Sequence, residues 1–213
     1  MLVEITGIDG SGKSTLIAKL RKHFNSIPLT WAYERSFKNR GKRFLEHIAL
    51  QQGKSRPEEI FDPALIEFHN ALEMVEEINK HFYYLSKDSG LLFFVDQYYT
   101  AWLAHAVRRK ITIVKELEAI YAYLPAPDLS IYLEVTTATA LTRLQCRVKG
   151  DQILNEQNPL RTLTNMKDSF DLVHRSVPYR QVRVDAEKEP EEVYTQVLEM
   201  ITVHSMTEVR QSK

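Results

Sequence analysis

The chain has 213 residues, of which 44% are hydrophobic and 26% charged, and 28 basic side chains balance 28 acidic ones. This composition is ordinary for a globular protein, and the length allows one large core, so we expect a single domain. The charge balance argues against a general polyanion binder, because nucleic-acid-binding domains usually carry excess Lys and Arg. Cys146 is the only cysteine, which excludes an intrachain disulfide and suits a reducing compartment.

No secretory leader is recognisable, since Met1 runs directly into a strand-like segment. The longest apolar run, residues 91–95, is far too short to span a bilayer. We therefore expect a cytoplasmic protein that has neither a membrane nor nucleic acid as a partner.

The first predicted elements are a strand at residues 2–6, a glycine-rich turn, and a helix from Thr15 onward. Residues 7–14 read GIDGSGKS and fit the phosphate-loop pattern G-x-x-x-x-G-K-[ST] at every fixed position. The glycines let backbone N–H groups converge on phosphate oxygens, and the helix start adds partial positive charge. We therefore predict an ATP site formed by Gly7, Asp9, Gly10, Ser11, Gly12, Lys13, Ser14 and Thr15.

Two side chains of this turn have a predicted chemical role. Lys13 would place its ammonium on the β- and γ-phosphates, and Ser14 would offer its hydroxyl to Mg²⁺. The alternative is a chance glycine turn after a strand, which the strand–turn–helix context disfavours.

Four further strand-like segments alternate with helical patterns at residues 28–33, 91–95, 129–135 and 179–184. Apolar runs that do not alternate with polar residues are typical of strands covered on both faces. Alternating strands and helices predict a parallel α/β sheet with right-handed crossovers. Ligands bind at the carboxyl ends of such strands, where Gly7 and Asp96 lie.

The clearest helical pattern covers residues 63–86. Its apolar side chains recur at spacings of three and four and predict a buried stripe of Leu65, Phe68, Leu72, Val75, Ile78, Phe82 and Leu85. Other faces are expected to carry Glu67, Glu73, Glu77 and Lys80. The last helix begins near Pro190, and we expect the domain to end near residue 204, with a frayed polar tail at residues 205–213.

Beyond the phosphate loop, the order and spacing of several stretches resemble the thymidylate kinase family of nucleoside monophosphate kinases. The resemblance runs from Val3 to about Val203, and its matching stretches are residues 7–15, 34–36, 95–98, 127–135, 184–186 and 191–193. It implies a P-loop NTPase fold with a five-stranded parallel sheet flanked by helices and a mobile lid, here at about residues 148–159. It also implies transfer of the γ-phosphoryl of ATP to dTMP, a requirement for Mg²⁺, and a homodimer.

The resemblance also suggests roles for individual residues. Asp9 would approach the acceptor sugar, Arg35 would hold the acceptor phosphate, and Asp96 would lie near the metal and the transferred group. Phe68 would stack on the acceptor base, although its place in the apolar stripe favours the core. Tyr98, with Tyr99 and Trp102, is a candidate for the pocket wall or for the core.

Two departures from the family pattern concern arginines that hold the acceptor. Gln97 stands where the family has arginine after the aspartate, and either Ala71 or Leu72 takes the place of an arginine in the preceding helix. A neutral side chain cannot copy a bidentate guanidinium–phosphate contact. Either another basic group substitutes or the acceptor is not dTMP. The candidates are Lys38, Arg40, Lys42 and Arg43, which could equally form a solvated face.

The family supplies a further arginine from the phosphate loop or the lid, and Gly10 fills the loop position here. Arg143 and Arg147 are four apart and are predicted to share a helical face. We expect one of them to close onto the donor phosphates, the alternative being an exposed helix end.

Three functions remain open at this point. The first is a kinase of dTMP or a related nucleotide, and the second is a kinase of an unphosphorylated nucleoside or other small metabolite. The third is a non-catalytic nucleotide-binding module.

Overall fold

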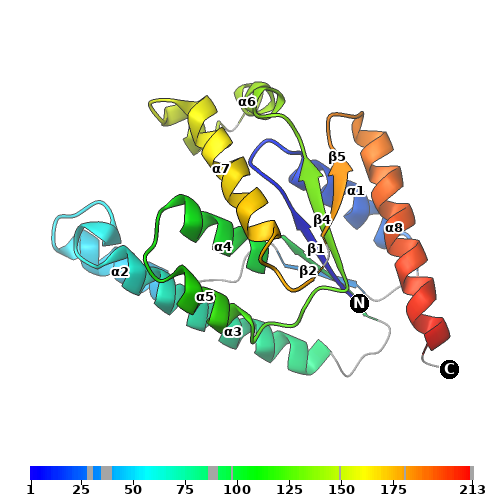
Figure 1. Ribbon diagram of the computed structural model, residues 1–213, viewed down its shortest axis with the longest axis horizontal. Helices are drawn as coiled ribbons and strands as arrows, with labels where there is room; N and C mark the ends of the chain where they lie inside the picture. The colour runs from blue at the N-terminus through cyan, green and yellow to red at the C-terminus, as the bar shows by residue number, and fades with distance from the viewer. Residues whose placement is uncertain are drawn as a thin grey trace.

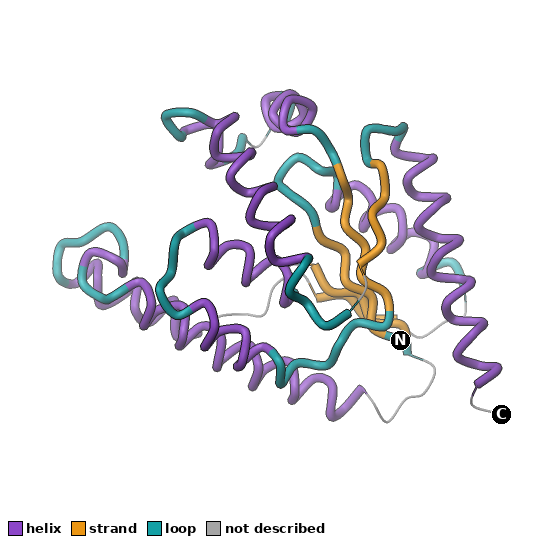
Figure 2. Tube along the Cα trace, viewed as in Figure 1, coloured by secondary structure: helices purple, strands orange, loops and turns teal. Residues whose placement is uncertain are grey.

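The computed structural model describes residues 1–27, 31–34, 40–85, 91–96, 98–148, 150–179 and 181–211. In this part of the chain, five parallel strands form one sheet in the order β2-β3-β1-β4-β5 (Figures 1 and 2). The predicted parallel sheet flanked by helices is confirmed. The strands are β1 (Leu2–Thr6), β2 (Trp31–Glu34), β3 (Leu92–Asp96), β4 (Leu129–Glu134) and β5 (Gln181–Asp185).

Helices cover both faces of the sheet (Figure 1). One face carries α1 (Lys13–Phe24) and α8 (Pro190–Gln211), which pack on each other, and the other carries α4 (Tyr99–Arg108) and α7 (Pro159–His174). The last helix continues to Gln211, through residues where a frayed polar tail was expected. The remaining elements are α2 (Arg40–Gln51), η1 (Pro57–Glu59), α3 (Pro63–Leu85), α5 (Val114–Tyr121), α6 (Thr137–Gln145) and η2 (Gln152–Asn155).

Strands β1, β3 and β4 are buried on both faces of the sheet, as their apolar runs indicate. Every residue of β1 and β3 is buried, including Glu4 and Asp96. The ring of Phe94 on β3 lies 5.3 Å from that of Phe24 at the end of α1. Among the described residues, none of the helices is both long and apolar enough to cross a membrane.

The buried stripe predicted for α3 is wrong in its first half. Leu65, Phe68 and Leu72 are 59%, 38% and 48% exposed. The hydrophobic residues of α3 that are buried are Ile66, Ala71, Met74 and Ile78. Only Ile78 was in the predicted stripe, and the other three lie one or two positions from its members. Helix α3 therefore has two apolar faces, and the spacing of apolar residues does not say which one packs.

An ion pair explains why α3 is oriented in this way. Glu67, expected on a solvent face, is only 7% exposed and contacts Nη1 of Arg109, which follows α4. Nη2 of the same guanidinium lies 2.9 Å from Oε1 of Glu58 on η1. Burial raises the pKa of Glu67, and the positive charge of Arg109 opposes that rise. Because the carboxylate is compensated, it can face the interior.

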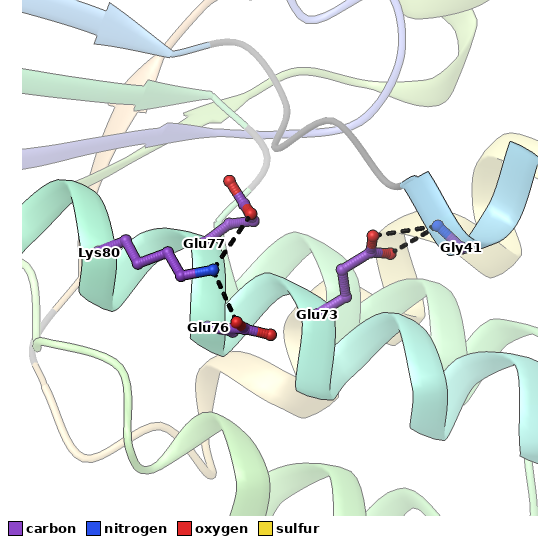
Figure 3. A network of polar contacts seen from close by, with 5 residues as sticks. All are labelled: Gly41, Glu73, Glu76, Glu77 and Lys80. Atoms are coloured by element: carbon purple, nitrogen blue, oxygen red, sulfur yellow. Dashed lines mark hydrogen bonds and ion pairs between the residues drawn. The ribbon is translucent and has the colours of Figure 1, made fainter.

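Other glutamates of α3 do lie toward solvent or toward α2 (Figure 3). The Glu73 carboxylate accepts hydrogen bonds from the Gly41 N–H at 3.0 and 3.2 Å, which places a negative group at the start of α2. Lys80 pairs with Glu76 at 2.6 Å and with Glu77 at 3.9 Å. Exposed pairs of this kind contribute less than about 1 kcal/mol each.

A second buried carboxyl lies in the middle of the sheet. Oε2 of Glu4 accepts a hydrogen bond from Ser130 on β4 at 2.6 Å, and from Thr100 on α4 and Tyr179 at 3.3 Å each. Gln181 on β5 donates to the Ser130 hydroxyl at 3.1 Å. Burial raises the pKa of Glu4, and the hydrogen bonds oppose the rise only in part. The native state therefore favours the protonated carboxyl more than the unfolded chain does.

Substituting Glu4→Gln should flatten the pH dependence of stability. Because the folded-state pKa is raised, the stabilising contribution of the protonated carboxyl is lost as pH rises from the ordinary value of 4.5. One such group reduces the free energy of unfolding by at most about 1.4 kcal/mol per pH unit. Urea unfolding from about pH 5 to about pH 9 measures this effect. The control Glu199→Gln makes the same change on the exposed face of α8, and equal slopes for the parent and Glu4→Gln would contradict the prediction.

Candidate functional site

The phosphate loop connects β1 to α1, with β3 and β4 on either side of β1. Gly10 and Gly12 have φ angles of 83° and 97°, which side chains other than glycine rarely adopt. A Cβ on Gly10 would lie 2.4 Å from the carbonyl oxygen of Ala140, so the loop packs closely on α6 at this point. A Cβ on Gly12 would meet nothing within 4 Å, which leaves the space before α1 open.

The start of α1 is suited to bind an anion. Gly12 provides no side-chain cap, and the first turn contains no acidic residue, so the first N–H groups have no side-chain acceptor. The Ser11 hydroxyl is buried with no hydrogen-bond partner among the described residues. These donors and the helix dipole fit the oxygens of a phosphate group.

Lys13 folds back over the loop. Its ammonium donates hydrogen bonds to the carbonyl oxygens of Gly7 at 2.7 Å and Ile8 at 3.0 Å. Burial lowers the pKa of Lys13, whereas the nearby charges of Asp9 and Asp96 raise it. The ammonium thus lies among the loop carbonyls and next to two carboxylates, where a phosphate would add further negative charge.

Asp96 lies at the carboxyl end of β3, opposite Ile5 of β1, and is 5% exposed. Ser14, in the first turn of α1, is exposed. Within the described ranges, no group of three His, Cys, Asp or Glu side chains could hold a metal. The described residues therefore form no all-protein metal cage. Ser14 and Asp96 fit Mg²⁺, which commonly takes one or two protein ligands together with phosphate oxygens and water.

A large hollow opens on one side of the phosphate loop, with a volume of about 830 Å³. We call it the α4 hollow, because Asp9 of the loop and the last turn of α4 form one wall and the segment between α6 and α7 forms the other. It is lined by Asp9, His105, Arg108, Gly150, Asp151, Gln152, Ile153, Leu154, Asn155, Glu156, Thr162 and Met166.

His105 carries no net charge in this hollow near neutral pH. Burial lowers the pKa of its imidazole to about 4, and the positive charges of Arg108, Lys13 and Arg109 act in the same direction. Asp9 opposes the shift. The imidazole is therefore neutral and can donate one hydrogen bond and accept another.

A smaller hollow of about 120 Å³ lies on the other side of the loop. We call it the α8 hollow. Its walls are mostly apolar. Arg143, one of the lining residues, donates a hydrogen bond from Nη2 to the Ala186 carbonyl at 2.8 Å. The lining residues are Ser11, Gly12, Thr15, Leu16, Leu133, Arg143, Ala186, Lys188, Pro190 and Val193.

The prediction that Arg143 and Arg147 share a helical face is wrong, because α6 ends at Gln145 and Arg147 lies beyond it. Arg143 belongs to the α8 hollow. Arg147 forms a 2.9 Å ion pair with Asp151, and its charge lies close enough to Lys13 to lower the pKa of that ammonium. The phosphate loop thus stands between two hollows. Arg143 lines the α8 hollow, whereas Arg147 pairs with Asp151, which lines the α4 hollow.

The sequence profile of the thymidylate kinase family matches residues 5–197. The chain belongs to the thymidylate kinase family. It is 26% identical to the probable thymidylate kinase 1 of Saccharolobus solfataricus over 94% of this chain and 96% of the relative. It is 28% identical to a thymidylate kinase of Akkermansia muciniphila over 95% and 91%, and 22% identical to one of Chlorobaculum parvum over 93% and 94%.

The residues expected to hold the acceptor are only partly brought together. Asp9 lines the α4 hollow, whereas Arg35, Lys38 and Gln97 lie outside the described residues. Tyr98 is fully buried, and its hydroxyl donates to the Pro125 carbonyl at 2.8 Å, so the structure corrects its assignment to the acceptor wall.

Phe68 is not among the residues that line the α4 hollow; it is partly exposed on α3. The two basic candidates whose side chains are described, Lys42 and Arg43, are exposed on α2 and do not line the hollow either. Sequence reasoning overlooked His105 and Arg108. Their spacing of three on the helix after Asp96 was the available signal.

Alanine at Gly10 should destabilise the protein more than alanine at Gly12. Both substitutions force a left-handed backbone, at about 1–2 kcal/mol each, but only Gly10→Ala also presses on the backbone of α6. We expect an additional loss of about 1–3 kcal/mol for Gly10→Ala. Urea unfolding without nucleotide measures the free energy of unfolding of both variants. Gly150→Ala is the control, with a φ of 68° and open space, and equal losses at all three positions would show that the contact with α6 is unimportant.

Proposed function

We propose that this member of the thymidylate kinase family transfers the γ-phosphoryl of ATP to dTMP or a related nucleotide, in the cytoplasm and with Mg²⁺. The observation that carries the proposal is the position of the phosphate loop between two hollows. A phosphoryl-transfer enzyme must align a donor and an acceptor on opposite sides of the transferred group. The family membership supports the same reaction.

The donor would occupy the start of α1 and the α8 hollow. The N–H groups of the first turn and Lys13 would hold its phosphates, and Leu16, Leu133 and Val193 would contact its base. Arg143 would form one wall of the base site. When bound, ATP with Mg²⁺ supplies the transferable phosphoryl group and part of the positive charge on its oxygens.

The acceptor would lie in the α4 hollow, whose volume falls within the range of about 300–1,000 Å³ usual for small-molecule sites. Asp9 stands where that hollow meets the phosphate loop and would accept a hydrogen bond from the acceptor. Asp96 and Ser14 would hold the metal, and Lys13 would bridge donor and transferred group. These roles account for the buried carboxylate at the end of β3.

The segment at residues 148–159 would act as the lid, with Arg147 as its functional cation. In the structure this guanidinium is held by Asp151, whose carboxylate also accepts from the Ile153 N–H at 3.1 Å. Contact with the donor phosphates would exchange one anionic partner of Arg147 for another. The exchange would couple triphosphate binding to the position of the lid.

A second candidate is a kinase of an unphosphorylated nucleoside or another small metabolite. It is favoured by α3, where Ala71 is fully buried and Leu72 faces solvent, so neither supplies the arginine expected from the family. A nucleotide-binding module without catalysis would require neither a 830 Å³ acceptor hollow nor the buried Asp96.

We also propose that the chain forms a homodimer through α3. Leu65, Phe68 and Leu72 lie on one helical face and are well exposed. Burial of this face against a second copy would remove apolar surface from water.

Purified parent protein should release ADP from ATP in the presence of dTMP, and the variants should separate the roles of the basic residues. We expect Lys13→Met to lower kcat/KM at least about 100-fold, because it removes charge from the transferred group. Arg147→Ala should lower kcat at saturating ATP by a similar factor. Arg143→Ala should chiefly raise the KM for ATP, since it removes a wall of the base site.

The acceptor panel decides between the candidates. Release of ADP with thymidine but not with dTMP would support the second candidate, and tight ATP binding without any acceptor-stimulated release would support the module. Arg161→Met removes an exposed arginine near the lid that lines neither hollow, and it should match the parent. An unimpaired Lys13→Met variant would overturn the proposal.

The Leu72→Glu variant should be monomeric where the parent is a dimer, because the charge would be buried at the contact. Light scattering of the protein as it elutes from a size-exclusion column measures the mass of the oligomer directly. Leu172→Glu is the matched control, since Leu172 is 58% exposed on α7. A monomeric parent, or equal dissociation by both variants, would rule out this interface.

A further inference from the structure

An ion pair lies in the turn between α6 and η2, beside the phosphate loop. Nη1 of Arg147 is 2.9 Å from Oδ2 of Asp151, and the two side chains are only 30% and 16% exposed. The Gly150 N–H donates to the Arg147 carbonyl at 3.0 Å, and Gly150 has a φ of 68°. The turn thus folds Asp151 back onto Arg147, in a place where either charge needs another partner once the pair is broken.

The Asp151 carboxylate uses its two oxygens differently. Oδ2 contacts Arg147, whereas Oδ1 accepts a hydrogen bond from the Ile153 N–H at 3.1 Å and caps η2. An asparagine can keep the cap through its amide oxygen, but it has no charge to offer the guanidinium. The substitution Asp151→Asn therefore separates the ion pair from the local backbone contact.

The charges of this pair act on the phosphate loop. Arg147 lowers the pKa of Lys13 and Asp151 raises it, so both groups lie within electrostatic reach of that ammonium. Among the described residues, Asp151 is the one acidic side chain that pairs with Arg147. Asp151 therefore offsets a repulsion between two cations that a bound triphosphate would also offset.

A triphosphate and Asp151 compete for the same guanidinium. The terminal phosphate carries more negative charge than a carboxylate, but its contact with Arg147 leaves Asp151 without a cation. Part of the binding free energy of the triphosphate is therefore spent on breaking the ion pair. ADP has no γ-phosphate, so the pair stays intact when ADP is bound.

We propose that Asp151 is a positioning residue that competes with the γ-phosphate for Arg147 and thereby restrains the affinity of the site for ATP. This inference depends on the proposed function, which assigns Arg147 to the donor phosphates. After transfer of the γ-phosphoryl, Asp151 recovers Arg147, so the guanidinium does not retain ADP. The carboxylate thus makes the contact between Arg147 and the nucleotide depend on the γ-phosphate.

Two other roles of Asp151 predict different effects. If Asp151 only fastened the turn, its loss would change the binding of every nucleotide equally. If it acted only as a negative charge near Lys13, it would repel phosphates whether or not Arg147 is present. Competition for Arg147 predicts an effect that is confined to the triphosphate and requires Arg147.

Calorimetry with Mg²⁺ and without an acceptor tests the proposal in the absence of turnover. The ligands are ADP and the non-hydrolysable triphosphate adenylyl imidodiphosphate. Asp151→Asn should bind the triphosphate about tenfold more tightly than the parent does, and ADP within about twofold. Arg147→Met should weaken the triphosphate alone, and the double variant should match Arg147→Met. Asp168→Asn, the same change at an exposed position of α7 that lines neither hollow, should match the parent.

Unchanged affinity for ADP also shows that the variants are folded. The proposal would be overturned by an Asp151→Asn variant that binds the triphosphate as the parent does, or whose affinity for ADP changes by the same factor. It would also be overturned by a gain that persists when Arg147 is methionine, or by an Arg147→Met variant with the triphosphate affinity of the parent. Failure of the proposed function is a different result, namely no ADP release from ATP with any acceptor, even where these affinities follow the expected pattern.

Discussion

The open start of α1 is the feature on which the rest of the site depends. Because Gly12 provides no side-chain cap and no acid stands in the first turn, the helix keeps unsatisfied N–H groups and a partial positive charge at the end of the central strand. Lys13 adds a full charge at the same point and, without phosphate, is satisfied by the loop carbonyls. The close contact of Gly10 with Ala140 fixes this arrangement against α6.

The parallel sheet explains why the two hollows lie on either side of that loop. β1 is central, so the chain leaves it between the carboxyl ends of β3 and β4. The β3 side continues into α4, which forms a wall of the α4 hollow. The far side of the loop is closed by the turn between β5 and α8, where Arg143 donates a hydrogen bond to the Ala186 carbonyl. The central position of β1 thus places a large polar hollow on one side of the loop and a small apolar hollow on the other. Their sizes and linings suit an acceptor and a donor base.

Buried carboxyl groups are accommodated in two ways, by pairing with a cation or by protonation. Glu67 is matched by Arg109, and Glu4 by hydroxyl groups and a raised pKa. Arg108 differs, because its Nε is buried on the wall of the α4 hollow without a hydrogen-bond partner among the described residues. Buried charge without a partner is the kind of feature that a ligand completes.

The sequence by itself determined the phosphate loop, the five strands, the strand-to-helix order and the family. These depend on local chemistry, namely glycine conformation, apolar runs and motif spacing, and are readable within a few residues. Only the tertiary structure decided that α3 buries Ala71 and Glu67 and exposes Leu72, that Tyr98 faces the core, and that Arg143 and Arg147 separate. The reason is that the orientation of a helix with two apolar faces, and the direction of a side chain beyond a helix end, are set by partners distant in the chain, such as Arg109 for Glu67 and Asp151 for Arg147.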